Sequence, residues 1–372
     1  MLTKKVICAG HICLDITPVF DGKRQIGKIG ELLVPGKLIN VSGAEVHTGG
    51  SVANTGLAMK ILGNDVTLMG KIGCDPFGGI VKNILHSYGC AGLIEDGGAT
   101  TSYSIVLAPP GIDRIFLHDP GANDSFVASD VSFDALACAD LFHFGYPTLM
   151  KAMFRNGGRE LAALFEKAKD AGCMTSLDLS AVDPASEAGR ADWARILGET
   201  LPYVDFFVPS FEELLYMLSR DEYDALQDQK SDVTQNVDFG KYVRPLAQRC
   251  IGMGARAVLI KCGISGMYLK TADKKALEKL GGKRTVDVEA WERFEKIEPC
   301  FKADVVRSAA GAGDVSIAAF LTAVLKGCAP GECIGYAAAE GALAVTSYDA
   351  LGAVEPLEEL KKRIQNGWER IG

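Results

Sequence analysis

The chain has 372 residues, of which 48% are apolar and 23% are charged. These proportions are those of a globular protein, and they exclude a disordered chain, a collagen and a small disulfide scaffold. A net charge of −8 without any run of Lys and Arg excludes an extended phosphate track for nucleic acid. A nucleotide stays compatible with this charge, because backbone amides and a metal ion can hold a triphosphate.

The 11 cysteines are scattered and form no C-x-x-C pair, which predicts reduced, buried thiols and hence a cytoplasmic protein. After Lys4 and Lys5 the apolar run Val6–Gly10 is too short for a signal peptide, and His11 follows it at once. No stretch approaches ~18 uninterrupted apolar residues, so we expect no membrane span.

Short apolar runs alternate with longer helical patterns along most of the chain. The runs expected to form strands are Val6–Ala9, Val66–Met69, Leu141–Phe144, Met174–Leu177, Asp205–Val208 and Ala257–Ile260. The patterns expected to form helices are Ser51–Leu62, Phe77–Tyr88, Gly158–Ala171, Glu212–Leu218 and Tyr242–Met253. This alternation predicts a mostly parallel sheet covered by helices on both faces, that is, a three-layer α/β/α sandwich.

Two segments, 12–48 and 101–122, are typical of β-structure without helices. Their expected strands are Asp15–Phe20, Lys37–His47, Thr101–Ala108 and Arg114–His118, with a hairpin turn at Pro109–Gly111. We expect these strands to pair as a small sheet beside the main body, suited to a lid over a cleft or to a dimer contact.

The rest of the chain divides into helices and two apparent insertions. Helices are expected at 312–326, 331–346 and 356–367. The segments 221–239 and 271–300 have the composition of surface insertions. With no repeat or linker evident, we treat residues 1–372 as one domain.

The strongest functional pattern is Gly311-Ala312-Gly313-Asp314, which leads directly into an apolar helix. Small residues let an anion approach the backbone, and unpaired amides at a helix start point toward it. Such a turn can stabilise a phosphoryl group in transfer, with Asp314 taking the proton of an attacking hydroxyl. The alternative is an acidic residue that caps a helix after a glycine turn.

A second glycine-rich entry into a helix begins at Gly49-Gly50-Ser51. Bare backbone at Gly49 and Gly50 lets a ligand lie against the chain. Asn54, one turn into the helix, offers a donor and an acceptor to vicinal hydroxyls. Simple helix capping is the alternative, and it accounts for Ser51 better than for Asn54.

Several motifs follow one another in a recognisable order. They are Gly10-x-x-x-x-Asp15, GGSVAN from Gly49, GKIGCDPFG from Gly70, His118-x-Pro120-Gly121-Ala122-Asn123, Val208-Pro209-Ser210-x-x-Glu213, Ile260-Lys261-x-Gly263-x-x-Gly266, and GAGD-x-x-x-x-x-F from Gly311. In this order they resemble the ribokinase-like carbohydrate kinases, also called the phosphofructokinase-B family, over roughly residues 5–350.

The resemblance implies a site that binds ATP, Mg²⁺ and a sugar. Asp314 matches the family's catalytic base, and Gly311, Ala312 and Gly313 match its anion hole. The positions matched to sugar binding are Asp15, Gly49, Gly50, Asn54 and Asn123. Lys261, Gly263 and Gly266 match the nucleotide loop, and Glu213 matches an acidic residue that helps organise Mg²⁺ through water. The two β-segments match a lid that closes over the sugar and mediates dimerisation.

The chain departs from the family pattern at two places. Ser308-Ala309-Ala310 stands ahead of Gly311 where the family usually has Asp-Thr, and this argues against a monovalent-cation site at that loop. Ser210 stands where Asn is usual in the Mg²⁺ motif, which leaves the carboxylate of Glu213. Neither departure touches Asp314.

These observations predict an ATP-dependent sugar kinase, acting as a homodimer through the lid. Two alternatives stay open: a nucleoside kinase of the same family, and a catalytically silent sugar-binding or regulatory protein on this scaffold. Tyr103, Arg114 and His118 are candidate lid contacts to substrate, or else solvated strand residues.

Overall fold

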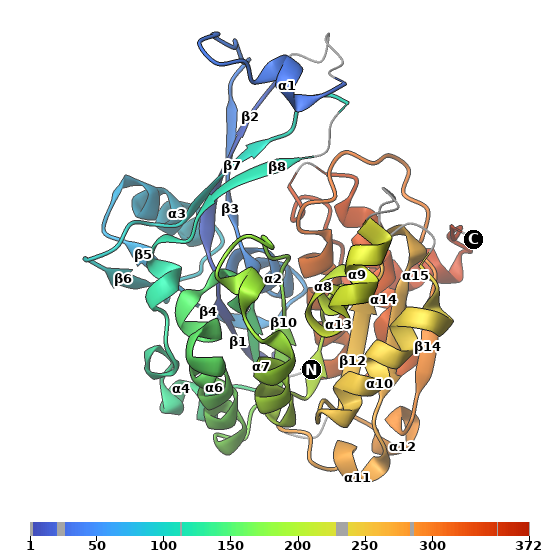
Figure 1. Ribbon diagram of the computed structural model, residues 1–372. Coiled ribbons are helices and arrows are strands. Elements are labelled where there is room, and N and C mark those ends of the chain that lie inside the picture. The colour runs from blue at the N-terminus through green and yellow to red at the C-terminus, as the bar shows by residue number, and fades with distance from the viewer. Residues whose placement is uncertain are drawn as a thin grey trace.

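The computed structural model describes residues 3–20, 27–111, 114–227, 237–282, 286–347 and 349–371. Its main sheet has the strand order β14-β13-β12-β11-β10-β9-β1-β4 (Figure 1). The strands are β1 (Lys5–Gly10), β4 (Asp65–Met69), β9 (Leu141–Gly145), β10 (Met174–Asp178), β11 (Phe206–Phe207), β12 (Ala257–Lys261), β13 (Met267–Thr271) and β14 (Glu295–Glu298).

Side chains of β1 alternate between two hydrophobic cores, one on each face of this sheet. Val6 and Cys8 belong to one core, and Ile7 and Ala9 to the other, because successive residues of a strand point to opposite faces. Helices that contribute to the first core include α2 (Ser51–Ile61), α3 (Pro76–Ser87), α13 (Ala312–Leu325), α14 (Pro330–Ala344) and α15 (Leu357–Gln365). Those of the second include α4 (Phe133–Cys138), α6 (Arg159–Asp170), α7 (Trp193–Thr200), α8 (Phe211–Leu218) and α10 (Arg244–Gly252). The three-layer sandwich is confirmed.

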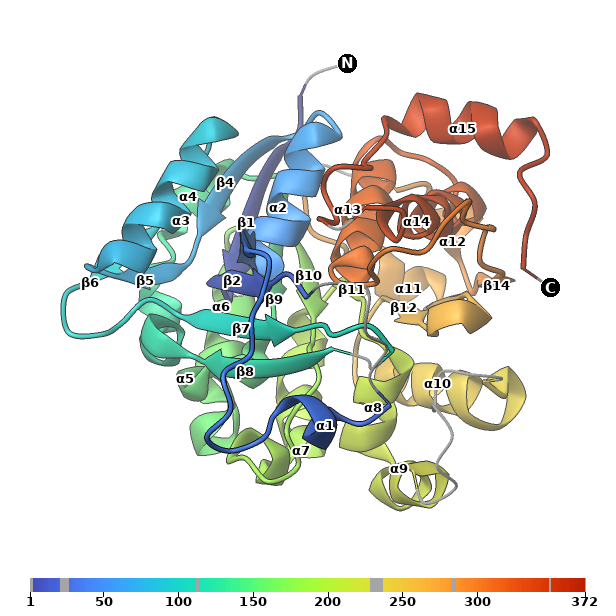
Figure 2. The ribbon, with the colours of Figure 1, turned by 90° about the horizontal axis from the view of Figure 1, so that it is seen from above.

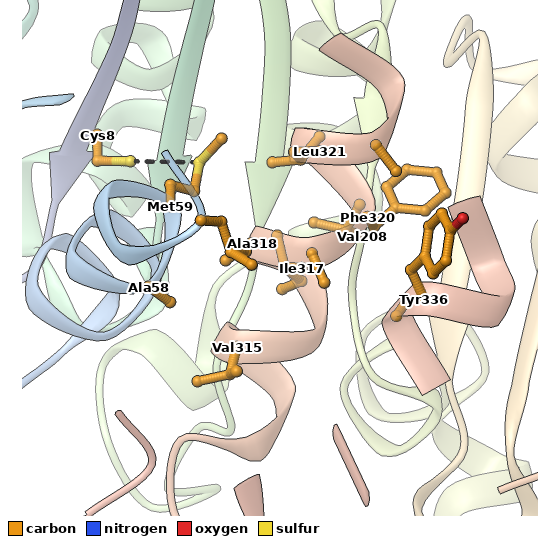
Figure 3. Packing of buried hydrophobic residues seen from close by; sticks show 14 of the residues in the cluster. Cys8, Ala58, Met59, Val208, Val315, Ile317, Ala318, Phe320, Leu321 and Tyr336 are labelled. Atoms are coloured by element: carbon orange, nitrogen blue, oxygen red, sulfur yellow. Dashed lines mark hydrogen bonds between the residues drawn. The ribbon is translucent and has the colours of Figure 1, made fainter. Parts of the chain in front are cut away.

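Helix α13 lies deep in the first core. Ile317, Ala318 and Leu321 are fully buried. On the side of α13 that faces α2, Met59 of α2 accepts a hydrogen bond from the thiol of Cys8 (Figure 3). On the opposite side of α13, the ring of Phe320 lies next to that of Tyr336 of α14 (Figure 3). Burial around the whole helix explains why its sequence is apolar with little periodicity, and it fixes the position of the residues at its N-terminus.

The segment 271–300 is not a surface insertion, so that expectation was wrong. It forms α11 (Lys274–Leu277), α12 (Val288–Trp291) and β14, which pairs at the edge of the main sheet. The side chain of Trp291 is buried against Phe206 and Phe320. β13 pairs antiparallel with both β12 and β14. Its direction relative to β12 follows because the turn after β12 is too short for a parallel crossover. In the other expected insertion, 221–239, helix α9 (Arg220–Gln227) forms the first part, and residues 228–236 lie outside the described residues.

The small sheet is confirmed and has the strand order β3-β2-β7-β8. Its strands are β2 (Cys13–Pro18), β3 (Ala44–Gly49), β7 (Tyr103–Leu107) and β8 (Ile115–Asp119). It stands above the edge at which β1, β9 and β10 end, and β7 and β8 reach across that edge when seen from above (Figures 1 and 2).

Two details of the small sheet differ from the sequence-based expectation. Residues 29–32 form a helical turn, α1 (Ile29–Leu32), in a segment expected to lack helices. The strand expected over Lys37–His47 begins only at Ala44, directly after Gly43, whose φ is 154°; a glycine often marks the point where extended pairing is interrupted.

The other described elements complete the layers. They include the parallel pair β5 (Lys71–Gly73) and β6 (Ile94–Asp96), helix α5 (Lys151–Phe154), several short 3-10 turns, and a π-helical turn over Phe239–Val243 that leads into α10. The thiols of Cys74 and Cys138 are exposed, so the expectation of uniformly buried cysteines was wrong for these two. Among the described residues no helix is long and apolar enough to cross a membrane.

Candidate active site

The glycine turn before α13 meets the start of α2. Gly311 is the residue before the helix and has φ 72°, a left-handed conformation that favours glycine. A Cβ atom there would lie 2.7 Å from the Cβ of Ala350 and 3.4 Å from Nδ2 of Asn54. The first amides of a helix lack intrahelical acceptors. The N–H of Ala312 donates to the carbonyl of Ala309 at 3.4 Å, a long bond that an anion at this turn can replace.

Asp314, in the first turn of α13, is 3% exposed and accepts three hydrogen bonds. Its Oδ2 atom accepts from Nδ2 of Asn54 at 3.0 Å and from the hydroxyl of Tyr146 at 2.7 Å. Its Oδ1 atom accepts from the hydroxyl of Thr55 at 3.2 Å. Burial raises the pKa of this carboxyl, and the donors Tyr146 and Asn54 and the charge of Lys261 oppose that rise.

Lys261, the last residue of β12, brings a positive charge beneath the glycine turn. Its Nζ lies 2.7 Å from Oδ1 of Asp178, and a Cβ added at Gly313 would stand 3.7 Å from it. Burial lowers the pKa of Lys261, but Asp178 and Glu213 outweigh this and hold that pKa above its usual range. Burial raises the pKa of Asp178, against the effect of Lys261. The ammonium therefore stays charged beside the proposed anion hole.

Glu213 caps α8 and faces the same region. Its Oε2 atom accepts a hydrogen bond from the backbone N–H of Ser210 at 2.7 Å, and the Ser210 hydroxyl accepts from the N–H of Glu213 at 3.4 Å. The serine that replaces the family's Asn is therefore a helix cap. Glu213 also contributes to raising the pKa values of Asp178 and Tyr146.

The acidic residues suit a magnesium ion held mainly by its substrate. Mg²⁺ is usually bound by one or two carboxylates together with phosphate oxygens and water. Asp178 and Glu213 provide two carboxylates beside the glycine turn. Over the described ranges no group of three or more His, Cys, Asp and Glu side chains is placed to hold an ion by itself. The residues present fit a metal that arrives with a nucleotide.

Asp15 of β2 lies on the other side of the site, close to Gly49. A Cβ at Gly49 would stand 2.1 Å from Oδ2 of Asp15, and the thiol of Cys13 donates to Oδ1 of Asp15 at 3.3 Å. Burial raises the pKa of Asp15, and Asp314 adds to the rise. The two carboxyl groups therefore face one shared region.

Gly50 and Asn123 define the floor beneath that region. Gly50 has φ 85°, and an added Cβ would meet the carbonyl oxygen of His11 at 2.5 Å. The Asn123 side chain is completely buried and bonds to backbone, accepting from Ile12 N–H at 3.1 Å and donating to the carbonyls of Ile12 and Pro120 at 2.9 and 3.0 Å. It was expected at the sugar, and the structure places its polar atoms on the chain instead.

The nucleotide-loop residues follow Lys261 at the turn between β12 and β13. Gly263 and Gly266 have φ values of 56° and 99°, and an added Cβ at Gly266 would lie 2.3 Å from the carbonyl oxygen of Glu298. This turn needs glycine at both ends. Lys261 ends the strand before this turn, and its side chain lies near Gly313 in the glycine turn of α13.

Sequence reasoning missed Tyr146, Thr55, Asp178 and His11. Asp178 and Tyr146 come at or just after the ends of strands β10 and β9, and polar residues at such ends are the signal that could have found them. Nε2 of His11 lies 3.3 Å from Nε2 of His118 on β8, which links the main body to the small sheet.

Solved structures match this fold over nearly its whole length. A ribokinase from Thermotoga maritima superimposes with a TM-score of 0.68 at 20% identity, covering 98% of this chain and 100% of that one. A fructokinase with bound ATP from Xylella fastidiosa gives a TM-score of 0.69 at 20% identity, covering 98% of this chain and 99% of that one.

The matches to curated relatives cover a smaller part of this chain. An uncharacterized sugar kinase of Archaeoglobus fulgidus is 25% identical over 279 residues, 74% of this chain and 90% of that protein. Fructokinase-1 of Zea mays is 30% identical over 183 residues, 45% of this chain and 56% of that protein. The chain thus matches only about half of the plant enzyme's length.

The match to a family is much broader, because the family model of the pfkB family carbohydrate kinases covers residues 3–356. That range contains the turn at Gly311, the buried Asp314 and the glycines before α2. The chain belongs to the pfkB family of carbohydrate kinases, phosphotransferases that act on a sugar hydroxyl.

Proposed function

We propose that this chain transfers the γ-phosphoryl group of ATP to a hydroxyl of a small, neutral carbohydrate, with Asp314 as the general base. The observation that carries the proposal is the juxtaposition of a buried carboxylate, a glycine turn at a helix start and the ammonium of Lys261. A base, an anion site and a fixed positive charge are what phosphoryl transfer requires, since positioning and electrostatic stabilisation supply most of its catalysis.

In this proposal Asp314 accepts the proton of the acceptor hydroxyl as its oxygen attacks the γ-phosphorus. The bond from that phosphorus to the β,γ-bridging oxygen breaks, and ADP leaves. The amides of Gly311, Ala312 and Gly313 and the ammonium of Lys261 stabilise the charge on the transferring group. Asp178 and Glu213 would hold Mg²⁺ that arrives with the nucleotide, and the ion would supply further charge neutralisation.

The sugar is proposed to lie between Asp15 and Asp314, against Gly49 and Gly50. One N–H of Asn54 Nδ2 donates to Asp314, so its second N–H and its amide oxygen are the groups offered to a hydroxyl. The small sheet is the proposed lid, and Gly263 and Gly266 are proposed to contact the nucleotide. Asn123 holds Ile12 in place and acts on the sugar site through the backbone.

A panel assay of ADP release separates this proposal from its alternatives. Sugars such as fructose and ribose are compared with nucleosides, each with ATP and Mg²⁺. Turnover with a sugar alone supports the proposal, and turnover with nucleosides alone identifies a nucleoside kinase. Binding of a sugar without ADP release identifies a silent binding protein.

Asp314→Asn tests the base, our first prediction. Turnover should fall by about 10²–10⁴-fold, because general-base catalysis contributes that much, while binding of sugar and nucleotide by calorimetry stays near wild type. Asp134→Asn is the matched control, since Asp134 also lies in a first helical turn but is exposed. An Asp314→Asn enzyme that keeps more than about half of the wild-type turnover would remove Asp314 from this role.

A further inference from the structure

Tyr146 has a strained backbone at the edge of the proposed active site. It follows β9 and has φ 65° and ψ 43°, the left-handed region that bulky residues seldom adopt. Such a conformation persists only where the surrounding structure enforces it, and it is found mostly at functional sites.

Hydrogen bonds hold this residue at its backbone and at its side chain. Its N–H donates to the carbonyl of Asp178 at 3.4 Å, and its own carbonyl accepts from the N–H of Leu149 at 3.1 Å. Its hydroxyl donates to Oδ2 of Asp314 at 2.7 Å. The turn after β9 therefore directs the phenol of Tyr146 at a carboxylate 168 residues further along the chain.

The two oxygens of Asp314 are unequally occupied. A carboxylate oxygen has about two acceptor sites. Oδ2 accepts from both Asn54 and Tyr146, whereas Oδ1 accepts only from Thr55 among the bonds that the described residues make to this carboxylate. The open acceptor site of the carboxylate is therefore on Oδ1.

We propose that Tyr146 is a positioning residue for the general base. By completing the hydrogen bonds of Oδ2 it leaves Oδ1 as the atom that receives the proton of the acceptor hydroxyl, and by donating a hydrogen bond it keeps the buried carboxyl ionised at neutral pH. The inference rests on the proposed function in taking Asp314 as the base, and it assigns to Tyr146 no contact with substrate.

The charged groups around Asp314 come from several elements. Lys261 of β12 favours its ionised form, while burial disfavours it. Asp15 of β2 and Asp178 of β10 interact with it as like charges. Two of the three acidic or basic neighbours thus oppose ionisation, so the donors to the carboxylate matter.

Tyr146 can fill this role because it stays protonated. An ordinary phenol keeps its proton at neutral pH, and this hydroxyl lies 2.7 Å from Oδ2 of Asp314. The hydroxyl is therefore a donor to the carboxylate at neutral pH. A hydrogen bond from a neutral donor to a carboxylate favours the charged form and lowers the carboxyl pKa; removing the donor must raise that pKa.

The test is Tyr146→Phe, which keeps the ring and removes only the hydroxyl. We expect the acid limb of the kcat/KM profile to move to higher pH by about one unit, so that activity falls about tenfold at pH values on the steep part of that limb and recovers in alkali. The KM for ATP should not change. Tyr216→Phe is the matched control, because that buried hydroxyl donates to the carbonyl of Gly189 away from Asp314.

A purely structural role predicts a different outcome. Loss of activity by the same factor at every pH, or a profile that superimposes on wild type, would overturn the proposal. If Tyr146→Phe does not fold, Tyr146→Asn replaces it, because Asn tolerates the left-handed conformation and also lacks the phenol; the same shift of the acid limb is expected.

A second readout does not depend on activity. The Asp314 carboxyl can be titrated by ¹³C NMR in protein labelled at aspartate, with Asp314→Asn identifying its signal. Tyr146→Phe should raise the pKa of that signal, and an unmoved pKa contradicts the proposal. If the wild-type protein phosphorylates no sugar, the proposed function fails, while this titration still decides whether Tyr146 keeps the carboxyl ionised.

Discussion

At the scale of single residues, Asp15 and Asn54 have different expected roles, which gives our second prediction. Asp15→Ala should raise the KM for sugar by about 5–150-fold with little change in kcat, since each lost polar partner of a buried hydroxyl costs about 1–3 kcal/mol. Asn54→Ala should lower kcat as well, because Nδ2 of Asn54 bonds to Asp314. Steady-state kinetics of both variants check this, and an unchanged KM in both would place the sugar elsewhere.

The third prediction concerns Glu340 of α14, a buried carboxyl away from the reacting groups. Its Oε1 atom accepts from the N–H of Glu355 at 2.9 Å, and Oε2 has no partner among the described residues. Burial raises its pKa to about 8. In the unfolded chain the group ionises near pH 4.5, so between those values the folded state holds the extra proton.

Stability must therefore fall as pH rises through that window, by up to about 1.4 kcal/mol per pH unit. Glu340→Gln removes the proton uptake, and it should flatten the dependence of the unfolding free energy on pH between about 5 and 8. Urea titrations across that range measure it. Glu199→Gln, at an exposed position, should leave the slope as in wild type; an unchanged slope in Glu340→Gln would contradict the assignment.

At the scale of elements, the start of α13 depends on the left-handed residue before it, and the fourth prediction follows. Gly311→Ala places a Cβ 2.7 Å from that of Ala350 at a positive φ. It should cost about 1–3 kcal/mol of stability and lower kcat, because the amides of the turn move. Thermal unfolding and kinetics check both effects.

Gly335→Ala in the neighbouring helix α14 is the matched control. No atom lies within 4 Å of the added Cβ, and glycine inside a helix is about 0.5–1 kcal/mol less favourable than alanine. This variant should therefore be more stable than wild type. Equal effects of the two substitutions would show that the turn has no special geometry.

The elements also show what the sequence could and could not predict. Alternation of Val6 and Cys8 with Ile7 and Ala9 reflects two covered faces, so the sandwich was predictable from local pattern. Strand β14, Glu295–Glu298, is an edge strand with polar residues, and it has no apolar run by which to recognise it. Its place in the sheet depends on pairing with β13 and on the burial of Trp291, which are tertiary effects.

Candidate residues were predictable where glycine or a helix start marks them. Gly50, Gly311 and Asp314 lie in such turns. Tyr146 meets Asp314 only because β9 and α13 converge in space, and no spacing in the sequence records that distance. Asn123 is the opposite case. A sequence motif identified this residue, but the motif did not reveal that its side chain bonds to the backbone of Ile12 and Pro120.

At the scale of the whole molecule, we propose a homodimer formed through the small sheet, the fifth prediction. Strands β3 and β8 are the outer strands of that sheet, and unpaired edges invite association. Phe116 and Leu117 on β8 are each 52% exposed, and Val46 on β3 is 39% exposed. These apolar side chains are available to a second copy.

Light scattering at micromolar concentration should give the mass of a dimer, and Leu117→Lys should shift it toward monomer. A charge at an apolar interface is left unpaired and opposes association. Val306→Lys, at an exposed site outside the small sheet, should leave the dimer intact. A strict monomer up to ~100 µM, well above the range of ordinary specific association, would contradict the proposal.

The side chain of Asn123, whose bonds to Ile12 were described above, is one of several links along the boundary between the two sheets. Four chain segments cross this boundary, next to His11, Gly50, Ser102 and Asp119. The carbonyl of His11 accepts from the N–H of Val52, and the Ser102 hydroxyl donates to the carbonyl of Asp119 at 2.7 Å. Each crossing is therefore bonded to another.

The small sheet is attached at four crossings that are bonded to one another in pairs. We propose that as a lid it moves like a flap that rotates about these attachments, because sliding or twisting would break several hydrogen bonds together. Such a rotation would return Asp15 and His118 to the same places at every closure, and the accuracy of closure would come from the stiffness of the boundary.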